Sequence, residues 1–150
     1  KFDREVKETP FFVFGGDPAD TARAVQLYMS VVGPTKTMRQ VPAKVAEFMK
    51  YMMNTYFATK LVFSYEMNQV CTKAGVDFNQ VRDIWSLDPR VDPMHTGVFP
   101  ENDQCFGGKC LPKDLSAFVT FSHRLGYKAE FLKEVMRSND RIGEIRAKNR

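Results

Sequence analysis

The segment CFGGKCLPKDL, residues 105–115, gathers residue types that can perform chemistry. Cys110 comes shortly before Pro112, a residue favoured in the first turn of a helix, so free backbone N–H groups and the helix dipole are expected to point toward its thiol. Lys109 and Lys113 add positive charge there. Both effects favour the nucleophilic thiolate over the thiol. The pattern predicts a reactive thiol; a small cysteine buried at a helix start is the alternative.

The neighbours of this thiol suggest how a reaction would be assisted. Gly107 and Gly108 remove side chains from the preceding loop, which lets a flat ligand approach the backbone. Asp114 lies one helical turn after Cys110 and could position or deprotonate water. A carboxylate in a first turn is also a common stabilising charge, so this role stays open.

Three further residues could act on a substrate. Lys50 and Asn54 are four residues apart in a helical pattern, so they share a face and could together hold a developing oxyanion. A solvent-facing pair is the simpler alternative. Arg90 lies in the turn-rich stretch LDPRVDP and could contact an anion, if it is not an ordinary surface arginine.

The cysteine pattern argues against a metal site and a disulfide framework. Cys105 and Cys110 have the wrong spacing for a zinc clip, and His95 and His123 add no ligand pattern. A bridge between Cys105 and Cys110 is geometrically possible. Three cysteines are few and odd in number, however, which favours free thiols in a reducing, cytoplasmic compartment. We expect no metal.

The N-terminal part of the sequence predicts a strand, a helix and a second strand, in that order. FFVFGG at 11–16 predicts a short buried strand, and Asp17 and Pro18 are suited to begin the helix that follows. Gly33-Pro34 ends that helix, and residues 35–41 predict a brief edge strand. One such unit cannot bury itself, so residues 1–39 are expected to be a fragment of a larger α/β layer.

The rest of the chain predicts a mainly α domain over residues 40–150. Residues 43–74 contain no Gly or Pro and have apolar residues at helical spacing, which predicts one very long helix ended by Gly75. A helix of this length in a small body usually lies in an interface, so we expect a homodimer through it. Shorter helices are expected from Asp77 to Trp85, from Pro112 to about 125, and over 128–147, with a long loop at 86–109.

The composition and charge of the chain argue against nucleic acids and membranes as partners. Hydrophobic residues make up 43% of the chain and charged residues 27%, which is typical of a globular protein. The net charge of +4 is spread along the sequence, so we expect no nucleic-acid partner. No apolar run reaches the length of a membrane span, so no membrane partner is expected, and the charged N-terminus is unlike a signal peptide.

The segment FGGKCLPKDL resembles the active-site segment of the UDP-glucose/GDP-mannose (nucleotide-sugar) 6-dehydrogenase family. AEFMKYMMNTYFATKLVFSYEMNQVC looks like that family's long central helix, GVDFNQVRDIWSLDPRV like its next stretch, and FFVFGGD like the end of its first Rossmann domain. The likeness runs in order over about residues 10–142. It implies a dehydrogenase dimerisation domain with a Rossmann remnant at its N-terminus.

The resemblance also implies a reaction: oxidation of a nucleotide-sugar alcohol to a carboxylate in two NAD-dependent hydride transfers. Cys110 would capture the aldehyde as a thiohemiacetal, Lys50 and Asn54 would stabilise oxyanions, and Asp114 would assist proton transfer. In addition, Lys113 would help to hold the cofactor, and Gly107, Gly108 and Arg90 would contact substrate, Arg90 across a dimer. UDP-glucose is the leading substrate and GDP-mannose the alternative.

The chain departs from this family in several places. It has no G-x-G-x-x-G, so NAD would be bound mainly by a domain absent from it, and alone it should not turn over. Cys105 replaces a small residue, the loop after Arg90 is longer, and Glu5 is only near the position of a first-domain glutamate. Two alternatives remain: a catalytically silent dimerisation module and a redox sensor using Cys105 and Cys110.

Overall fold

The computed structural model describes residues 6–99 and 105–148 and divides them into two compact units, 1–50 and 51–150. The division falls inside the longest helix, and the domain boundary predicted after residue 39 stays a prediction. Glu5 and residues 100–104 of the predicted loop lie outside the described residues. The described part is mainly helical, with one small parallel sheet, as predicted.

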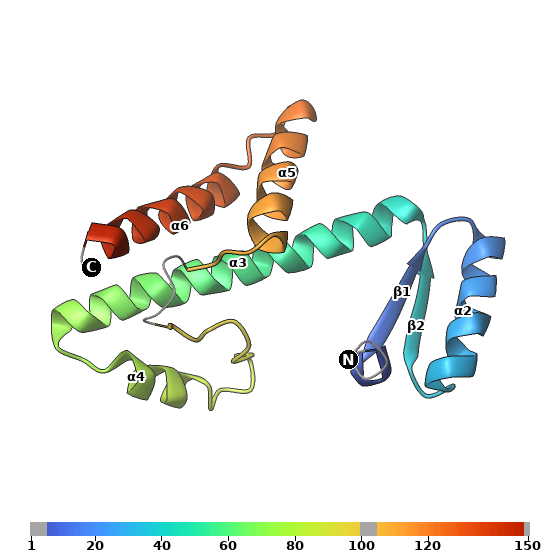
Figure 1. Ribbon diagram of the computed structural model, residues 1–150, viewed down its shortest axis with the longest axis horizontal. Helices are drawn as coiled ribbons and strands as arrows, with labels where there is room; N and C mark the ends of the chain where they lie inside the picture. Colours follow the sequence, from blue (N-terminus) through green and yellow to red (C-terminus); the bar gives the residue numbers. More distant parts are fainter. Residues whose placement is uncertain (1–5, 100–104, 149–150) are drawn as a thin grey trace. The chain divides into compact units, whose positions relative to one another are not determined.

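In the first unit a helix covers a two-stranded sheet (Figure 1). Strand β1 (Phe11–Gly15) pairs in parallel with β2 (Thr37–Val41), so that Phe11 lies opposite Thr37. Helix α2 (Pro18–Val32) connects them. The Asp17 carboxylate caps this helix by accepting a hydrogen bond of 2.9 Å from the N–H of Ala19, as its place in the sequence predicted.

Aromatic contacts hold α2 against the sheet. The Tyr28 ring lies 5.3 Å from that of Phe12 and 5.1 Å from that of Phe14, both edge-on. Gly15 lets the end of β1 approach the start of the next helix, because an added Cβ would come within 2.5 Å of the Ala46 Cβ. The strand–helix–strand prediction is confirmed, but the prediction of a buried first strand is wrong: none of the residues of β1 is buried, because a single helix and one neighbouring strand cannot cover it.

Helix α3 (Ala43–Ala74) has the bounds that the sequence predicted and is about 48 Å long at 1.5 Å per residue. It ends in a Schellman motif: Gly75 has a φ of 70°, its N–H reaches the Thr72 carbonyl at 3.2 Å, and the Val76 N–H reaches the Cys71 carbonyl at 2.9 Å. Helix α4 (Phe78–Trp85) follows directly, capped by the Asp77 side chain.

Helices α5 (Cys110–Arg124) and α6 (Glu130–Lys148) complete the second unit. The predicted start of α5 at Pro112 is two residues late. Proline is tolerated throughout the first turn, where backbone N–H groups have no helical partner, so Pro112 can follow Cys110 and Leu111 inside the helix. α6 begins slightly later than predicted.

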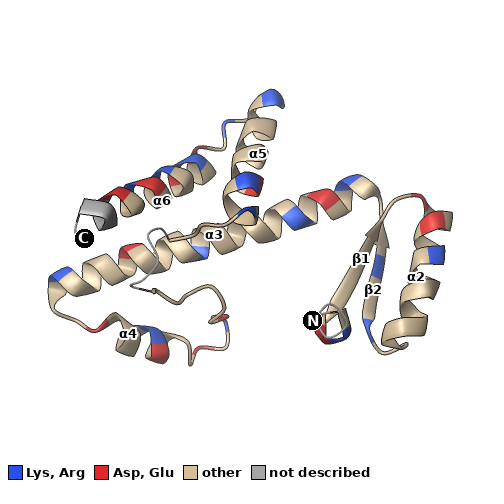
Figure 2. Cartoon of the chain, in the orientation of Figure 1, with Lys and Arg blue, Asp and Glu red and all other residues tan. Residues whose placement is uncertain are grey.

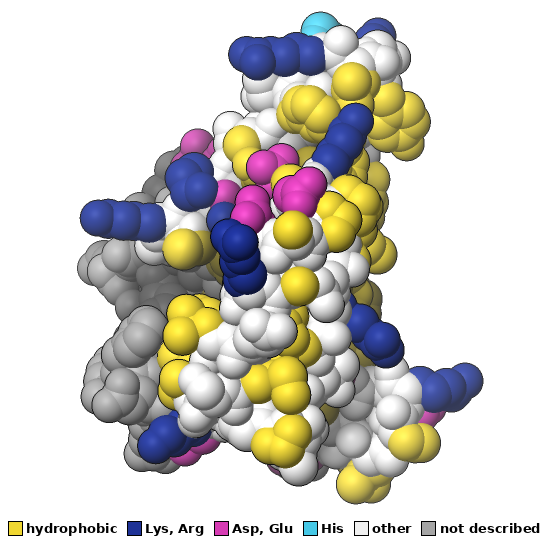
Figure 3. Space-filling model, turned by 90° about the vertical axis from the view of Figure 1, so that its right-hand side faces the viewer, with side chains coloured by type: hydrophobic (Ala, Val, Ile, Leu, Met, Phe, Trp, Pro, Cys, Tyr) yellow, Lys and Arg dark blue, Asp and Glu magenta, His cyan; other side chains and the backbone are white. Residues whose placement is uncertain are grey.

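The core of the second unit lies between α3, α5, α6 and the segment before α5. Its buried hydrophobic members are Ala58, Val62, Tyr65, Cys105, Phe106, Leu115, Val135 and Ile142. Charged residues are sparse along the middle of α3 and frequent on α6 (Figure 2). Hydrophobic side chains also reach the surface, as one face of the molecule shows in yellow between charged side chains (Figure 3).

Candidate active site

Cys110 is the first residue of α5, and its side chain is exposed. Cys71 and Cys105 are buried, and all three cysteines are free thiols. The backbone N–H of Cys110 belongs to the first turn, where donors have no helical partner. Of the three thiols, therefore, the one singled out by sequence is the one that solvent and ligands reach.

Asp114 lies one turn further along α5 and is 1% exposed. One of its oxygens, Oδ2, accepts a hydrogen bond of 2.6 Å from the amide Nδ2 of Asn54, and Oδ1 accepts one of 2.5 Å from the ammonium of Lys113. A buried carboxylate needs such partners, because burial without them would oppose its charge. Asp114 thus joins α3 to α5 beside the thiol.

The neighbours of Lys113 in this cluster raise the pKa of its ammonium group. The hydrogen bond from Lys113 to Asp114, and then the charge of that carboxylate, raise the pKa of Lys113 above its usual value. Electrostatic interactions with Tyr51 and then Cys110 add smaller effects in the same direction, so Lys113 lies within electrostatic reach of Cys110. Lys113 is 63% exposed, so part of its cationic head faces solvent.

Lys50 precedes Asn54 by one turn on α3, but it belongs to the first compact unit. The structure therefore brings Asn54, Lys113 and Asp114 together near Cys110, and leaves the role of Lys50 a prediction. Asn54 is oriented by its bond to Asp114. An amide nitrogen carries two hydrogens, and Asp114 accepts one of them.

The exposed residues 107–109, two of them glycines, form a strap between the buried Phe106 and Cys110. Phe106 is buried, whereas Gly107, Gly108 and Lys109 are exposed. Gly108 has a φ of 73°, which other residues rarely adopt, and an added Cβ would meet no atom within 4 Å. The bare backbone beside Cys110 is therefore open to a flat ligand, as the sequence suggested.

Arg90 lies in a different part of the second unit. Its guanidinium forms a fork with Asp88, with hydrogen bonds of 2.5 to 3.1 Å to the two carboxylate oxygens, and its side chain is 87% exposed. The hydrogen bonds that the Arg90 guanidinium donates to the Asp88 carboxylate raise the pKa of Arg90 and lower the pKa of Asp88. Arg90 thus does not join the cluster around Cys110 within this chain.

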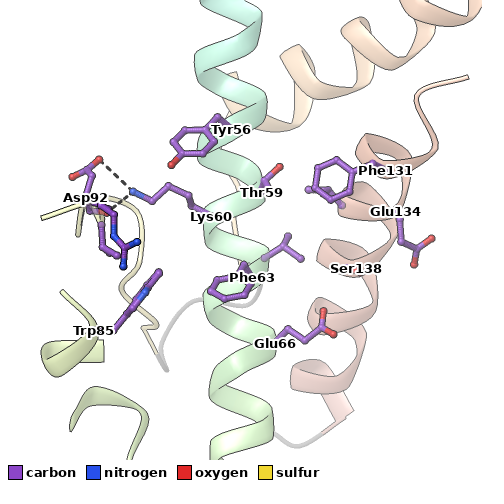
Figure 4. Close-up of a pocket in the computed structure, with 14 residues that line it drawn as sticks. Tyr56, Thr59, Lys60, Phe63, Glu66, Trp85, Asp92, Phe131, Glu134 and Ser138 are labelled. Carbon is purple, nitrogen blue, oxygen red and sulfur yellow. Dashed lines mark hydrogen bonds and ion pairs between the residues drawn. The ribbon is translucent and has the colours of Figure 1, made fainter. Parts of the chain in front are cut away.

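Arg90 lines a hollow of about 440 Å³ over one face of α3 (Figure 4). Helix α6 borders it on one side, with Phe131 and Ser138, and Trp85 and Asp92 border it on the other. The floor of the hollow, supplied by α3, includes Tyr56, Thr59, Phe63 and Glu66. Its lining is mostly apolar, although it is open to solvent.

Two anchoring residues were not found from the sequence. Lys60 is 9% exposed and holds the loop after α4, because its ammonium donates to the Asp92 carbonyl at 2.5 Å and contacts the Asp92 carboxylate at 3.2 Å. The Asn139 side chain accepts a hydrogen bond from the N–H of Phe106 at 3.0 Å. A lone lysine in an apolar stretch was a weak signal for the first, and nothing in the sequence marked the second.

Among residues 6–99 and 105–148, no group of three or more His, Cys, Asp or Glu is arranged to hold a metal ion. His95 has a φ of 62° and stacks on Phe57, with ring centroids 4.2 Å apart. Within the described part of the chain, no helix has both the length and the apolar character that crossing a bilayer would require.

Comparison with known proteins points to one family. The model for the central domain of the UDP-glucose/GDP-mannose dehydrogenase family matches residues 44–141. GDP-mannose 6-dehydrogenase of Azotobacter vinelandii is 34% identical over 131 residues, which are 87% of this chain and 29% of that protein. UDP-glucose 6-dehydrogenase of Pseudomonas aeruginosa is 31% identical over 122 residues, 80% of this chain and 26% of that protein.

A solved structure agrees with these matches. The UDP-glucose dehydrogenase of the hyperthermophilic archaeon Pyrobaculum islandicum superposes with a TM-score of 0.78 at 28% sequence identity, covering 91% of this chain and 30% of the other. The chain therefore spans less than a third of the length of each of these three proteins.

Proposed function

Since this chain belongs to the UDP-glucose/GDP-mannose dehydrogenase family, we propose that the protein containing it is an NAD-dependent nucleotide-sugar 6-dehydrogenase that oxidises UDP-glucose to UDP-glucuronate. One observation carries the proposal: an exposed cysteine begins α5, and a buried carboxylate one turn later joins it to an amide of α3. GDP-mannose is the alternative substrate, because relatives of both kinds match this chain at similar identity.

Cys110 is the nucleophile in this proposal. Its thiolate adds to the carbonyl carbon of the aldehyde made in the first oxidation, so that a C–S bond forms and the carbonyl oxygen becomes an oxyanion that takes up a proton. The second oxidation removes a hydride from the carbon and a proton from the hydroxyl group of this thiohemiacetal, which leaves a thioester. Water then adds to the thioester carbon, the C–S bond breaks, and the carboxylate, the thiolate and two protons are released.

The polar cluster of Asn54, Lys113 and Asp114 stabilises the charges that develop in these steps. The second N–H of the Asn54 amide, with the ammonium of Lys50, stabilises the oxyanion. Asp114 has both oxygens bonded and is almost fully buried, so its first task is to orient Asn54 and Lys113. It assists proton transfer through these partners, and the structure supports a positioning role more directly than a role as a free base.

This chain supplies a few contacts to NAD and does not supply a complete binding pocket for it. The sequence has no G-x-G-x-x-G, whereas the bare backbone at Gly108 and the ammonium of Lys113 suit the edge of a flat, anionic cofactor. When bound, NAD supplies the hydride acceptor for both oxidations. The contribution of this chain is to present the thiol and to hold the charges around it.

The long helix makes the proposed homodimer. Along the second unit's part of α3, the large side chains of Met52, Tyr56, Phe63 and Val70 are 50 to 73% exposed. Their spacing of four, seven and seven residues puts them on one helical face, which also forms the floor of the hollow. A second copy covering this face would bring its own Arg90 toward the substrate of its partner.

The test is NADH formation by the full protein with UDP-glucose and with GDP-mannose, beside its Cys110→Ala variant. We expect two NADH per sugar with one substrate, and none with the variant. Cys71→Ala, which removes a buried thiol outside the cluster, is the control and should retain turnover. No turnover of either sugar by the wild-type protein would favour another nucleotide sugar, or a silent module kept for assembly.

A further inference from the structure

A buried hydrogen bond ties α6 to the segment that leads to Cys110. The N–H of Phe106 donates to the side-chain oxygen Oδ1 of Asn139 at 3.0 Å, across 33 positions of sequence. Asn139 is 4% exposed and Phe106 is 5% exposed. The contact is thus sheltered from water, where a lost acceptor cannot be replaced easily.

This hydrogen bond lies at the point where the chain leaves the core and enters the exposed segment before Cys110. The side chains of Cys105 and Phe106 are in the core, with Leu115, Val135 and Ile142. The chain then leaves the core, and three exposed residues, 107–109, lead to the thiol. Two of the three are glycines, which have the widest conformational freedom of all residues.

The strap of residues 107–109 is therefore held from its two ends by different helices. At its far end, Asp114 bonds Asn54 and Leu115 is fully buried, so α5 is attached to α3. At its near end, Phe106 is in an irregular segment without a strand or helix partner for its N–H, and Asn139 supplies the acceptor from α6. That acceptor fixes the N–H of Phe106, the last buried residue before the strap, and so helps to set the direction in which the chain enters it.

We propose that Asn139 is a positioning residue for the reaction at Cys110: by binding the N–H of Phe106, it sets the path of the Gly107–Gly108 strap along which substrate and cofactor approach the thiol. The inference rests on the proposed function, because it concerns the same cysteine. Asn139 lies outside the hollow and the Asp114 cluster. Its loss should therefore affect kcat more than the binding of nucleotide.

The competing explanation is that Asn139 only stabilises the core. The two explanations differ in what a second destabilising substitution on α6 would do. Ile142 is 6% exposed, belongs to the same core and lies one turn from Asn139, and its side chain has no polar atom to bond the strap. Ile142→Ala is therefore the matched control: it destabilises the same helix and leaves the bond to Phe106 intact.

The experiment compares Asn139→Leu, Asn139→Asp and Ile142→Ala in the full protein. Asn139→Leu has a similar size and no acceptor, whereas Asn139→Asp keeps an oxygen in the same place. We expect Asn139→Leu to lower kcat by about tenfold with KM changed less than about twofold, since small misplacements near a reacting group are costly. Asn139→Asp keeps the acceptor oxygen, so the N–H of Phe106 should stay protected from exchange in this variant, although a buried carboxyl group lowers its Tm. Ile142→Ala should lower Tm with kcat close to wild type. Asn139→Ala replaces Asn139→Leu if the latter does not fold.

Hydrogen exchange over residues 105–110 and the alkylation rate of Cys110 are measured on the same proteins. Exchange of the Phe106 amide should accelerate in Asn139→Leu and not in Ile142→Ala. Equal kcat and equal exchange in wild type and Asn139→Leu, with only Tm reduced, would overturn the proposal. If the protein oxidises no nucleotide sugar at all, the proposed function fails, while exchange and alkylation still decide whether Asn139 holds the strap.

Discussion

The cluster around Cys110 and the hollow around Arg90 are assembled in opposite ways. In the cluster, a carboxylate that is 1% exposed bonds partners from two helices. At the hollow, Arg90 is 87% exposed, and its guanidinium bonds Asp88, its near neighbour in sequence. In the cluster, polar groups from two helices of one chain bind one another. The hollow is mostly apolar, with several charged side chains among the residues that line it, a mixture that interfaces between proteins also show.

Removal of Asp114 should have the largest effect on the cluster. Asp114→Ala leaves the Asn54 amide and the Lys113 ammonium without their acceptor, and we expect kcat of the full protein to fall by about a hundredfold, in the range seen when an oxyanion contact is lost. The free energy of unfolding should fall by about 2 kcal/mol, because a buried bond between α3 and α5 is lost.

Lys113→Ala is the comparison for this change. The side chain of Lys113 is 63% exposed, so solvent screens its ion pair and its removal should lower the free energy of unfolding less than the removal of Asp114 does. Thermal unfolding of both variants measures the difference. Equal losses of stability in the two would contradict the claim that the buried carboxylate joins the helices.

A charge placed in the hollow should weaken the proposed dimer. Phe63 is 50% exposed on the floor of the hollow, and Phe63→Glu would put a carboxylate into an apolar contact. We expect the dissociation constant to rise by about thirtyfold or more, the size of effect typical of a central interface residue. Sedimentation of the full protein at micromolar concentration measures it.

Leu125→Glu provides the control for the hollow. Leu125 is 66% exposed at the end of α5, and it does not line the hollow. Its substitution adds the same charge at a surface without a proposed partner, so the assembly should be unchanged. A wild-type protein that sediments only as a monomer would refute the dimer itself.

The three thiols offer a direct measure of access to the cluster. Cys110 is exposed, whereas Cys71 is 8% and Cys105 is 4% exposed. Alkylation at neutral pH should therefore modify Cys110 at least about ten times faster than the other two, because reaction needs an accessible thiolate. Mass spectrometry of the modified peptides resolves the three rates. If mild peroxide linked Cys105 to Cys110, the redox-sensor alternative would gain support instead.

The smallest expected effect is a dependence of Tm on pH through the Asp92 carboxylate, in the loop beside the hollow. The backbone N–H of Met94, and then the ammonium of Lys60, lower the pKa of Asp92 below 3.8. A carboxyl whose pKa is lowered by folding contributes stability above its unfolded pKa, and this contribution is lost as the pH falls through its folded pKa. The Tm of wild type should exceed that of Asp92→Asn at pH 6, and the gap should narrow below pH 3.8. A constant gap over this range would argue against the ionised contact.

Much of the fold followed from local signals. The absence of Gly and Pro over residues 43–74 and the Gly at 75 were sufficient for α3, because helix formation and termination depend on residues close in sequence. Asp17 and Asp77 cap the helices that they were expected to cap. Pro112 was misleading as the first residue of α5, because a proline fits any position of a first turn.

The candidate site divides in the same way. Cys110, its preceding glycines and its nearby lysines are neighbours in sequence, so their types and spacing predicted a reactive thiol at a helix start. A buried cysteine was the alternative, and the structure shows that Cys110 is exposed. The sequence also indicated the family. It left open whether Asp114 was an exposed helix charge or part of the site, because burial of a side chain depends on which other helices pack against it.

Only the tertiary structure decided the contacts between distant residues. Asn54 meets Asp114 across 60 positions, and Phe106 meets Asn139 across 33. No periodicity or local motif specifies such pairs, since they form only when α3, α5 and α6 pack around one core. The sequence by itself determined which cysteine stands at the start of a helix among glycines and lysines, and the packing of α3, α5 and α6 decided which distant side chains hold the segment around that cysteine in place.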